Sequence, residues 1–267
     1  MTGDQVVRRE VLAHEPAEAL AAMLDIDFPQ GTDLPALWHW VYLLERRPQR
    51  DLGPDGHPVS GIPSPPGPGR RRMFAGGRVR THRPLMRGRE AVRTTWVIST
   101  KEKTGRTGPL TFVTVRNDIS QDGQVVIEDE QDIVYRAGDA SLPQAGPGEG
   151  SATPVREPSL TLEVDSRLLF RFSALTYNAH RIHYDREFLN DEGYDDLVVH
   201  GPLQALMMGE LLRRNGVDLL GREYAYRLIA PMIGPQQMTV AAAERGLDVG
   251  AETRDAQGTI AAVSTLR

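Results

Sequence analysis

The sequence predicts an α+β chain of two halves, each with an antiparallel sheet that wraps a central helix. Three observations lead to this fold class. A stretch of Gly, Pro and small residues at 137–159 divides the 267 residues near their middle. Each half shows a helical region followed by about four segments rich in β-branched residues. Asp122-Gly123 is a hairpin signal between two of these segments, and a hairpin joins antiparallel strands.

The composition, with 40% hydrophobic and 25% charged residues, is that of a globular protein that can bury a large core. The formal net charge of -5 gives no overall basic surface for nucleic acid. Without cysteine, the chain forms no disulfide, thiolate nucleophile or cysteine-ligated metal site. A charged N-terminus and the lack of an apolar run of about 20 residues predict a soluble cytoplasmic protein with no membrane contact.

The N-terminal half is expected to hold two helices and four strands. The helices are predicted at 17–26 and 33–47. Asp33 can cap the second helix and Pro35 suits its first turn. The strands are predicted at 76–85, 91–100, 109–119 and 124–136. The acidic run 128–130 in the last strand predicts a solvated strand edge.

The C-terminal half opens with 159–175, and its most clearly marked element is a helix at 201–214. Gly201-Pro202 suits the first turn, and Asn215-Gly216 is a stop signal. Apolar side chains occupy several sides of this helix, so it should be enclosed by the protein. Strands are predicted at 224–233, 236–244, 247–255 and 259–266. Two such halves, 1–140 and 159–267 with a linker at 141–158, would form a double hot-dog.

The segment FSALTYNAHRIHYD gathers the side chains best suited to chemistry: Asn178, His180, His183 and Asp185. Imidazole takes and gives a proton near neutral pH because its ordinary pKa is about 6.5. An amide can orient a water molecule or a carbonyl group. These groups suit the addition or removal of water, or proton transfer next to a carbonyl. A metal site using both histidines with His200 or Asp185, and purely structural histidines, are the alternatives.

Gly201 is expected at the N-terminus of the second-half helix. A backbone N–H at that position has no intrahelical acceptor and lies at the positive end of the helix dipole. It can therefore stabilise negative charge that develops on an oxygen. A histidine loop ahead of such a helix end suits enolate chemistry on a thioester, with the loop moving the proton and the Gly201 amide holding the oxyanion.

The stretch FSALTYNAHRIHYD…GYDDLVVHGPL resembles the hydratase-2 motif of MaoC-like enoyl-CoA hydratases and dehydratases. In this register Asn178 stands at the family's catalytic aspartate, His183 at its catalytic histidine and Gly201 at its oxyanion-donating glycine. LPALWHWVYLL, LGPDGHP, GRVRTHRPL, EKTGRTGPLTFVTVR and EDEQDIVYR are similar to the double hot-dog branch of mesaconyl-C4-CoA and itaconyl-CoA hydratases, to which mitochondrial-type 3-hydroxyacyl-thioester dehydratases are related. The resemblance covers most of 15–265. It implies a lyase that hydrates a 2,3-enoyl thioester or dehydrates a 3-hydroxyacyl thioester.

The resemblance also implies roles for the site residues. His183 would be the main acid and base, Asn178 and His180 would orient water, and Gly201 would hold the oxyanion. No metal and no cofactor beyond the coenzyme A thioester substrate is implied. Asn178 departs from the family pattern, because a neutral amide cannot act as a general base. His183 acting alone, His180 or Asp185 in the missing role, or a different course of reaction remain open.

The expected substrate-binding residues are Arg181, Asp185, His200 and Arg83. Asp185 would orient a histidine or cap a short helix. Arginine forks suit coenzyme A phosphates and the carboxylate of a branched dicarboxylic acyl chain, and the run 70–72 supplies further candidates. The N-terminal half would shape the acyl pocket without acid or base groups.

The expected partner is an acyl-CoA or acyl carrier protein thioester, and the expected assembly is a homodimer. A hot-dog acyl-CoA thioesterase and an inert acyl-thioester-binding protein are the alternative functions.

Overall fold

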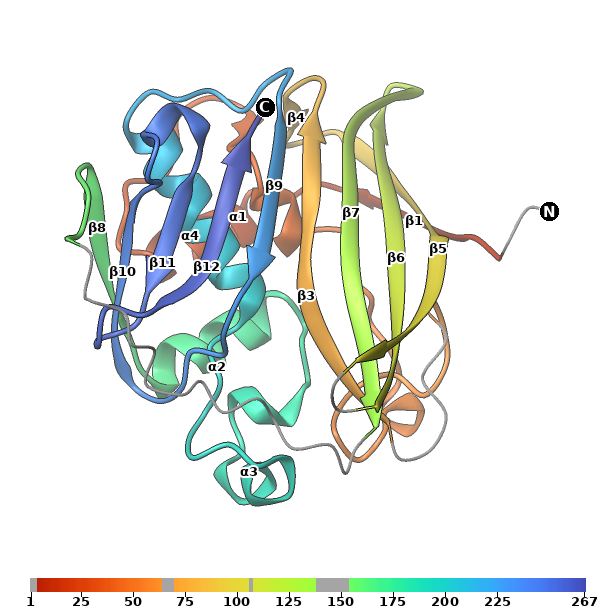
Figure 1. The fold of residues 1–267 in the computed structure, drawn as a ribbon. Helices are drawn as coiled ribbons and strands as arrows, with labels where there is room; N and C mark the ends of the chain where they lie inside the picture. Colours follow the sequence, from red (N-terminus) through yellow and green to blue (C-terminus); the bar gives the residue numbers. More distant parts are fainter. Residues whose placement is uncertain (1–3, 64–69, 106–107, 138–153) are drawn as a thin grey trace.

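Ten strands form one antiparallel sheet in the computed structural model, which describes residues 4–63, 70–105, 108–137 and 154–267. The strand order is β1-β5-β6-β7-β3-β9-β12-β11-β10-β8 (Figure 1). The N-terminal half supplies β1 (Val6–Val11), β3 (Arg70–Thr81), β5 (Glu90–Gly105), β6 (Gly108–Gln121) and β7 (Gln124–Ala137). The C-terminal half supplies β8 (Ser159–Val164), β9 (Glu223–Leu228), β10 (Gln236–Ala242), β11 (Ala251–Arg254) and β12 (Ile260–Leu266).

The two halves meet where β3 pairs with β9, so their sheets are continuous. Each half thus contributes an antiparallel part of one continuous sheet, and this arrangement with few helices agrees with the predicted α+β class. The hairpin between β6 and β7 turns at Asp122 and Gly123, both with positive φ, as the Asp-Gly signal predicts. Most of the predicted linker lies outside the described residues.

The helices are α1 (Glu15–Met23), α2 (Ser166–Leu175), α3 (Arg186–Glu192) and α4 (Gly201–Arg214). In Figure 1, α1 and α4 lie behind the sheet, and α3 lies below α2. The central helix α4 packs against β10, β11 and β12. Its buried residues occupy every side of its first three turns, which confirms that the helix is enclosed.

The helix predicted at 33–47 does not form. Asp33–Leu34 is the short strand β2, which pairs with β4 (Leu85–Met86), and a 3-10 helix spans Trp38–Val41. Leu37 takes a positive φ of 72°, which an α-helix cannot contain. Trp38 is fully buried and donates a hydrogen bond to Glu210 of α4 at 2.8 Å. Tertiary contacts therefore override the helical spacing of the apolar residues. The buried side chains of this segment pack in directions that a single α-helix could not give them.

The acidic run 128–130 does not lie on a solvated edge as predicted. It belongs to β7, which is paired on both sides by β3 and β6. Because successive side chains of a strand point to opposite faces, Glu128 and Glu130 form ion pairs with Arg116 while Asp129 points inward and is 2% exposed. The sheet thus carries a buried carboxylate into the interior of the protein.

Candidate active site

A cavity of about 1220 Å³ is lined by both halves of the chain. The C-terminal half contributes Asn178, His180, His183 and Gly201, which the sequence singled out. The N-terminal half contributes residues of β3, β5, β6, β7 and of the Pro- and Gly-rich segment before β3. The described structure therefore brings the four predicted catalytic residues to one wall and faces them with polar side chains from the other half.

The histidine loop is held by side chains that bond to its own backbone. Asp165 accepts a hydrogen bond from the Leu168 N–H and starts α2, which leads into the loop. Asn178 Oδ1 accepts from the His180 N–H at 3.0 Å, so its amide oxygen supports the loop. Asp185 accepts from the Glu187 and Phe188 N–H groups and caps α3, as predicted.

His183 is the base that the local geometry prepares best. Its Nδ1 lies 2.7 Å from the carbonyl oxygen of Val198. A carbonyl only accepts, so Nδ1 carries the proton and Nε2 keeps a free lone pair. The side chain is 7% exposed, and this burial lowers the pKa of His183 to about 4 although the Val198 carbonyl opposes the shift. His183 is therefore neutral, and Nε2 can accept a proton at physiological pH.

Four imidazoles lie in a row. The ring centroids of His57 and His180 are 4.0 Å apart, those of His180 and His183 are 5.5 Å apart, and those of His183 and His200 are 3.6 Å apart. Burial lowers the pKa of each of them, and the positive charge that a neighbouring histidine would carry lowers those of His180, His183 and His200 further. A proton on one ring therefore makes protonation of the adjacent rings less favourable.

His200 lies behind the cavity wall. It is 0% exposed, its Nε2 lies 2.8 Å from Ser173 Oγ, and its ring stacks on His183. Gly201 follows it as the first residue of α4 and faces the cavity. The Gly201 N–H finds no acceptor among the described residues, as expected for the first turn of a helix. This free N–H and the positive helix end are suited to a developing oxyanion.

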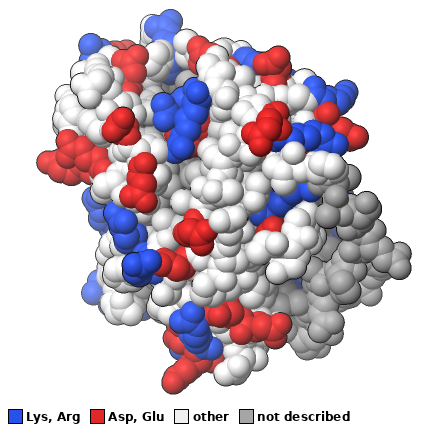
Figure 2. All heavy atoms as spheres, turned by 90° about the vertical axis from the view of Figure 1, so that its left-hand side faces the viewer, with Lys and Arg blue, Asp and Glu red and all other residues white. Residues whose placement is uncertain are grey.

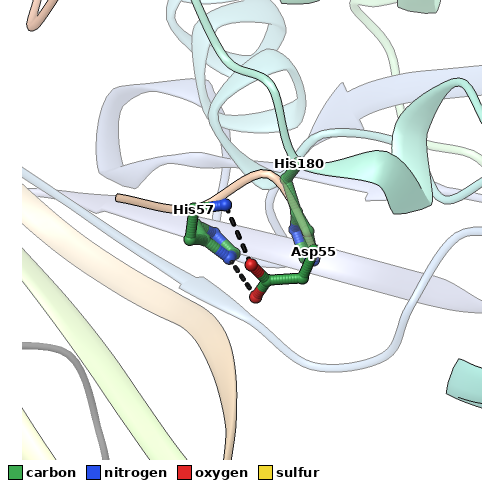
Figure 3. Close-up of side chains that lie close together, drawn as sticks. All are labelled: Asp55, His57 and His180. Carbon is green, nitrogen blue, oxygen red and sulfur yellow. Dashed lines mark hydrogen bonds and ion pairs between the residues drawn. The ribbon is translucent and has the colours of Figure 1, made fainter. Parts of the chain in front are cut away.

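Asp55 and His57 reach the histidine loop from the N-terminal half (Figure 3). Asp55 Oδ2 lies 2.9 Å from His57 Nδ1, and Asp55 Oδ1 accepts from the His57 N–H at 2.9 Å. Burial alone would raise the pKa of Asp55, but its hydrogen bonds with His57 hold that pKa well below its usual range. Neither residue was predicted from the sequence, although both stand in the segment LGPDGHP, where an acid and an imidazole interrupt a turn-forming stretch.

Asp55, His57 and His180 have the spacing of a possible metal site, since one ligand atom of each lies within 4.8 Å of the others. The charge of Arg72 acts on all three, lowering the pKa of His57 and His180 and itself being attracted to Asp55. A permanent positive charge at this place disfavours a divalent cation. The three residues are better suited to proton chemistry than to holding a metal ion.

The predicted substrate-binding arginines lie elsewhere. Arg83 is exposed and does not line the cavity. Arg181 pairs with Asp185 at 2.7 Å and donates to the Pro54 carbonyl oxygen, so it joins two loops. Among the arginines of the run 70–72, Arg72 lines the cavity. Burial lowers the pKa of the Arg72 guanidinium, and it forms no ion pair with the described residues.

Some polar side chains of the N-terminal half also line the cavity. Asp129 Oδ2 accepts hydrogen bonds from Trp40 Nε1 and Gln131 Nε2, both at 3.1 Å. Asn117 accepts from the Thr95 hydroxyl at 2.7 Å. Thr95, Asn117, Asp129 and Gln131 lie on β5, β6 and β7, and Trp40 lies in the 3-10 helix. These strands carry polar residues on both faces, so the sequence does not show which of them point inward. The wall can therefore meet a polar part of a ligand.

No helix in the described parts of the chain is long and apolar enough to cross a membrane. On the face shown in Figure 2, acidic and basic side chains are interspersed, so this face carries no large patch of one sign.

Comparisons with known proteins show the family to which the chain belongs. The family model of hydroxyacyl-thioester dehydratase type 2 matches residues 37–234. The chain is 43% identical to the mesaconyl-C(4)-CoA hydratase of Chloroflexus aurantiacus, over 94% of this chain and 91% of that protein.

Two solved structures share the fold. A MaoC-like dehydratase from Phytophthora capsici has a TM-score of 0.70 at 12% identity, covering 100% of this chain and 96% of that one. A Mycobacterium tuberculosis protein described as a double hotdog fold has a TM-score of 0.57 at 13% identity, covering 100% and 96%. The two-sheet architecture is thus a double hot-dog, and the chain belongs to the hydroxyacyl-thioester dehydratase type 2 family.

Proposed function

We propose that this chain is a hydro-lyase that adds water to the 2,3-double bond of an enoyl-CoA, or removes water from the 3-hydroxyacyl-CoA. The observation that carries the proposal is the pairing of His183 with Gly201 on one cavity wall. His183 offers a free Nε2 lone pair, and Gly201 offers a free N–H at a helix N-terminus. A base and an oxyanion donor are the two groups that such a reaction needs.

In the hydration direction, the oxygen of water bonds to Cβ while one of its protons leaves. The electron pair of the double bond moves toward the thioester oxygen, where the Gly201 N–H and the α4 dipole stabilise the charge. A proton then reaches Cα, and the net change is the addition of one water. His183 exchanges the proton, while Asn178, through its free Nδ2, and His180 orient the water. No redox step is involved.

The acyl chain in this proposal is branched and dicarboxylic. The 43% identical relative is named a mesaconyl-C(4)-CoA hydratase, and this name implies a free carboxylate on the acyl group. Arg72 is a partly buried residue that lines the cavity without an ion-pair partner in the described structure, and desolvation lowers the pKa of its guanidinium. A substrate carboxylate would supply that partner and offset the desolvation of the guanidinium.

The test compares thioesters with and without this carboxylate. Wild type, Arg72→Gln and the exposed control Arg83→Gln are incubated with crotonyl-, mesaconyl- and itaconyl-CoA, and the mass gain of one water is followed. Arg72→Gln should raise KM for the dicarboxylic substrate by ~10–100-fold, as expected for loss of a charged hydrogen bond, and should leave the KM for crotonyl-CoA little changed. An equal effect on both substrates would overturn the carboxylate assignment.

His183→Ala tests the reaction class. This variant should lose hydration of every substrate that wild type hydrates. If wild type instead releases free thiol without adding water, the protein is a thioesterase. If wild type binds the thioesters without turnover, it is an inert acyl-thioester-binding protein. The homodimer remains a prediction, which light scattering in solution can check.

A further inference from the structure

The segment that carries Asp55 and His57 is fixed against the histidine loop. The Arg181 N–H donates to the Asp55 carbonyl oxygen at 2.9 Å, and Arg181 Nη1 donates to the Pro54 carbonyl oxygen at 2.9 Å. Gly56, between the two side chains, has a φ of +88°, and a Cβ there would overlap the carbonyl oxygen of Ala179. Only glycine allows this close approach, so the two loops form one packed unit.

Asp55 and His57 form an oriented acid–imidazole pair, of which His57 lines the cavity. A carboxylate only accepts, so the 2.9 Å contact places the proton of His57 on Nδ1 and leaves a lone pair on Nε2. The carboxylate also stabilises the imidazolium that forms when Nε2 takes a proton. Such a pair is stronger than a histidine alone at removing a proton from water.

On the other wall, position 178 carries an amide and not a carboxylate. Asn178 is neutral, and its oxygen is already bonded to the His180 N–H. His180 lies between the two bases, with its ring 4.0 Å from that of His57 and 5.5 Å from that of His183. Two imidazoles with free Nε2 atoms thus lie on either side of a third, and the only carboxylate bonded to any of the three belongs to Asp55 among the described residues.

We propose that His57, oriented by Asp55, is the catalytic base that removes the proton from the attacking water, a role that the neutral amide of Asn178 cannot fill. This inference rests on the proposed hydratase function and divides its proton transfer between two residues. It gives the N-terminal half a chemical role, where the sequence predicted only a shaping one.

Every proton in the proposed hydration step is accounted for. The water oxygen bonds to Cβ as one water proton moves to His57 Nε2, and the double-bond electrons move toward the thioester oxygen at Gly201. His57 then releases this proton to solvent water, and His183 takes one proton from water and delivers it to Cα. Both bases return to their neutral starting state, and dehydration follows the same steps in reverse.

The experiment measures mesaconyl-CoA hydration by wild type, His57→Ala, Asp55→Asn and His14→Ala. His14 is exposed and lies outside the cavity, so its variant is the matched control. His57→Ala should lower kcat by ~100-fold or more, as general-base catalysis predicts, with KM within a few-fold. Added imidazole should restore part of that kcat, because a small base can occupy the space of the lost ring. A purely structural histidine would show no such rescue.

Asp55→Asn is nearly isosteric and keeps the inference testable if His57→Ala does not fold. The groups that act on His57 are Asp55, which raises its pKa, and Arg72, which lowers it, with His180 adjacent in the row. Removing the carboxylate should lower kcat and should move the acid limb of the kcat/KM profile to lower pH. An unchanged profile with unchanged kcat would overturn the inference.

Further outcomes distinguish failure of the His57 inference from failure of the hydratase function and from a metal site. If His57→Ala retains kcat within ~3-fold of wild type, or loses it without rescue by imidazole, the inference is wrong while the hydratase function stands. If wild type adds no water to any of the thioesters, the hydratase function itself is wrong, and the inference falls with it. If a chelator abolishes wild-type activity and added Zn²⁺ restores it, Asp55, His57 and His180 hold a metal, which also overturns the inference. Full activity in the chelator supports it.

Discussion

Acidification from pH 7 to pH 4 should destabilise this protein through His183. In the unfolded chain, histidine titrates near 6.5, whereas in the folded protein burial lowers the pKa of His183 to about 4. Between these values the unfolded state binds more protons, so the free energy of unfolding falls as pH falls through this window. The difference of about 2.5 pKa units, at 1.36 kcal/mol each, corresponds to ~3 kcal/mol for this one side chain.

The assay is urea unfolding of wild type and His183→Gln at intervals from pH 7 to pH 4. Glutamine can donate to the Val198 carbonyl and does not titrate. Loss of packing in the variant lowers its free energy of unfolding by the same amount at every pH. Loss of the titrating group changes how steeply the free energy of unfolding depends on pH. Groups far from His183 contribute equally to both proteins and cancel in the difference. That difference should change by ~3 kcal/mol across the window in favour of the variant at low pH.

A difference that stays constant from pH 7 to pH 4 would refute the reasoning, because it would mean that His183 titrates alike in the folded and unfolded chain. The neighbouring imidazoles act in the same direction, since burial also lowers the pKa of His180 to about 2. Wild type should therefore be markedly acid-labile below pH 6.5, while its stability above that pH should depend little on these histidines.

Three further substitutions test other parts of the structure. Gly56→Ala should separate the two active-site loops and lower kcat/KM by ~10-fold or more. The control Gly31→Ala, at a glycine of similar φ with open space around it, should leave kcat/KM unchanged. Steady-state kinetics on both variants tests this. Trp38→Phe should remove the hydrogen bond to buried Glu210 and reduce the free energy of unfolding by ~1–3 kcal/mol in urea, and a loss below ~0.5 kcal/mol would contradict this. Asp165→Ala should lower stability by ~1 kcal/mol through loss of the α2 cap, measured by thermal unfolding; no change would show that the cap is dispensable.

Local signals predicted the elements whose stability depends on nearby residues. The helix α4 begins at Gly201-Pro202 and ends before Asn215-Gly216, as these residues indicate. The β6–β7 hairpin turns at its Asp-Gly pair. The edge strand β1 was not predicted, because three consecutive charged residues interrupt its valines and give no clear alternation of apolar and polar side chains. An edge strand tolerates such charges, since one of its faces and one of its sides meet solvent.

The segment 33–47 shows where local reasoning failed. Its apolar residues recur at helical spacing, but Trp38 bonds to Glu210 of α4, and the Tyr42 hydroxyl bonds to the carbonyl oxygen of Ala13. These partners lie far away in the sequence, so no local pattern reports them. The prediction for Asp129 was wrong for a related reason. Pairing on both sides places β7 inside the sheet, and the alternation of side chains along β7 directs the Asp129 carboxylate into the cavity.

The sequence by itself determined the chemistry available on one wall: a histidine loop, an amide at 178, and a glycine that opens a helix. These follow from short spacings, and helix and turn propensities act over the same short range. Only the tertiary structure decided which groups meet them. Packing at Gly56 brings Asp55 and His57 against His180, and the pairing of β3 with β9 joins the two halves around one cavity. Contacts between distant segments depend on how the whole core packs, and no short stretch of sequence encodes that.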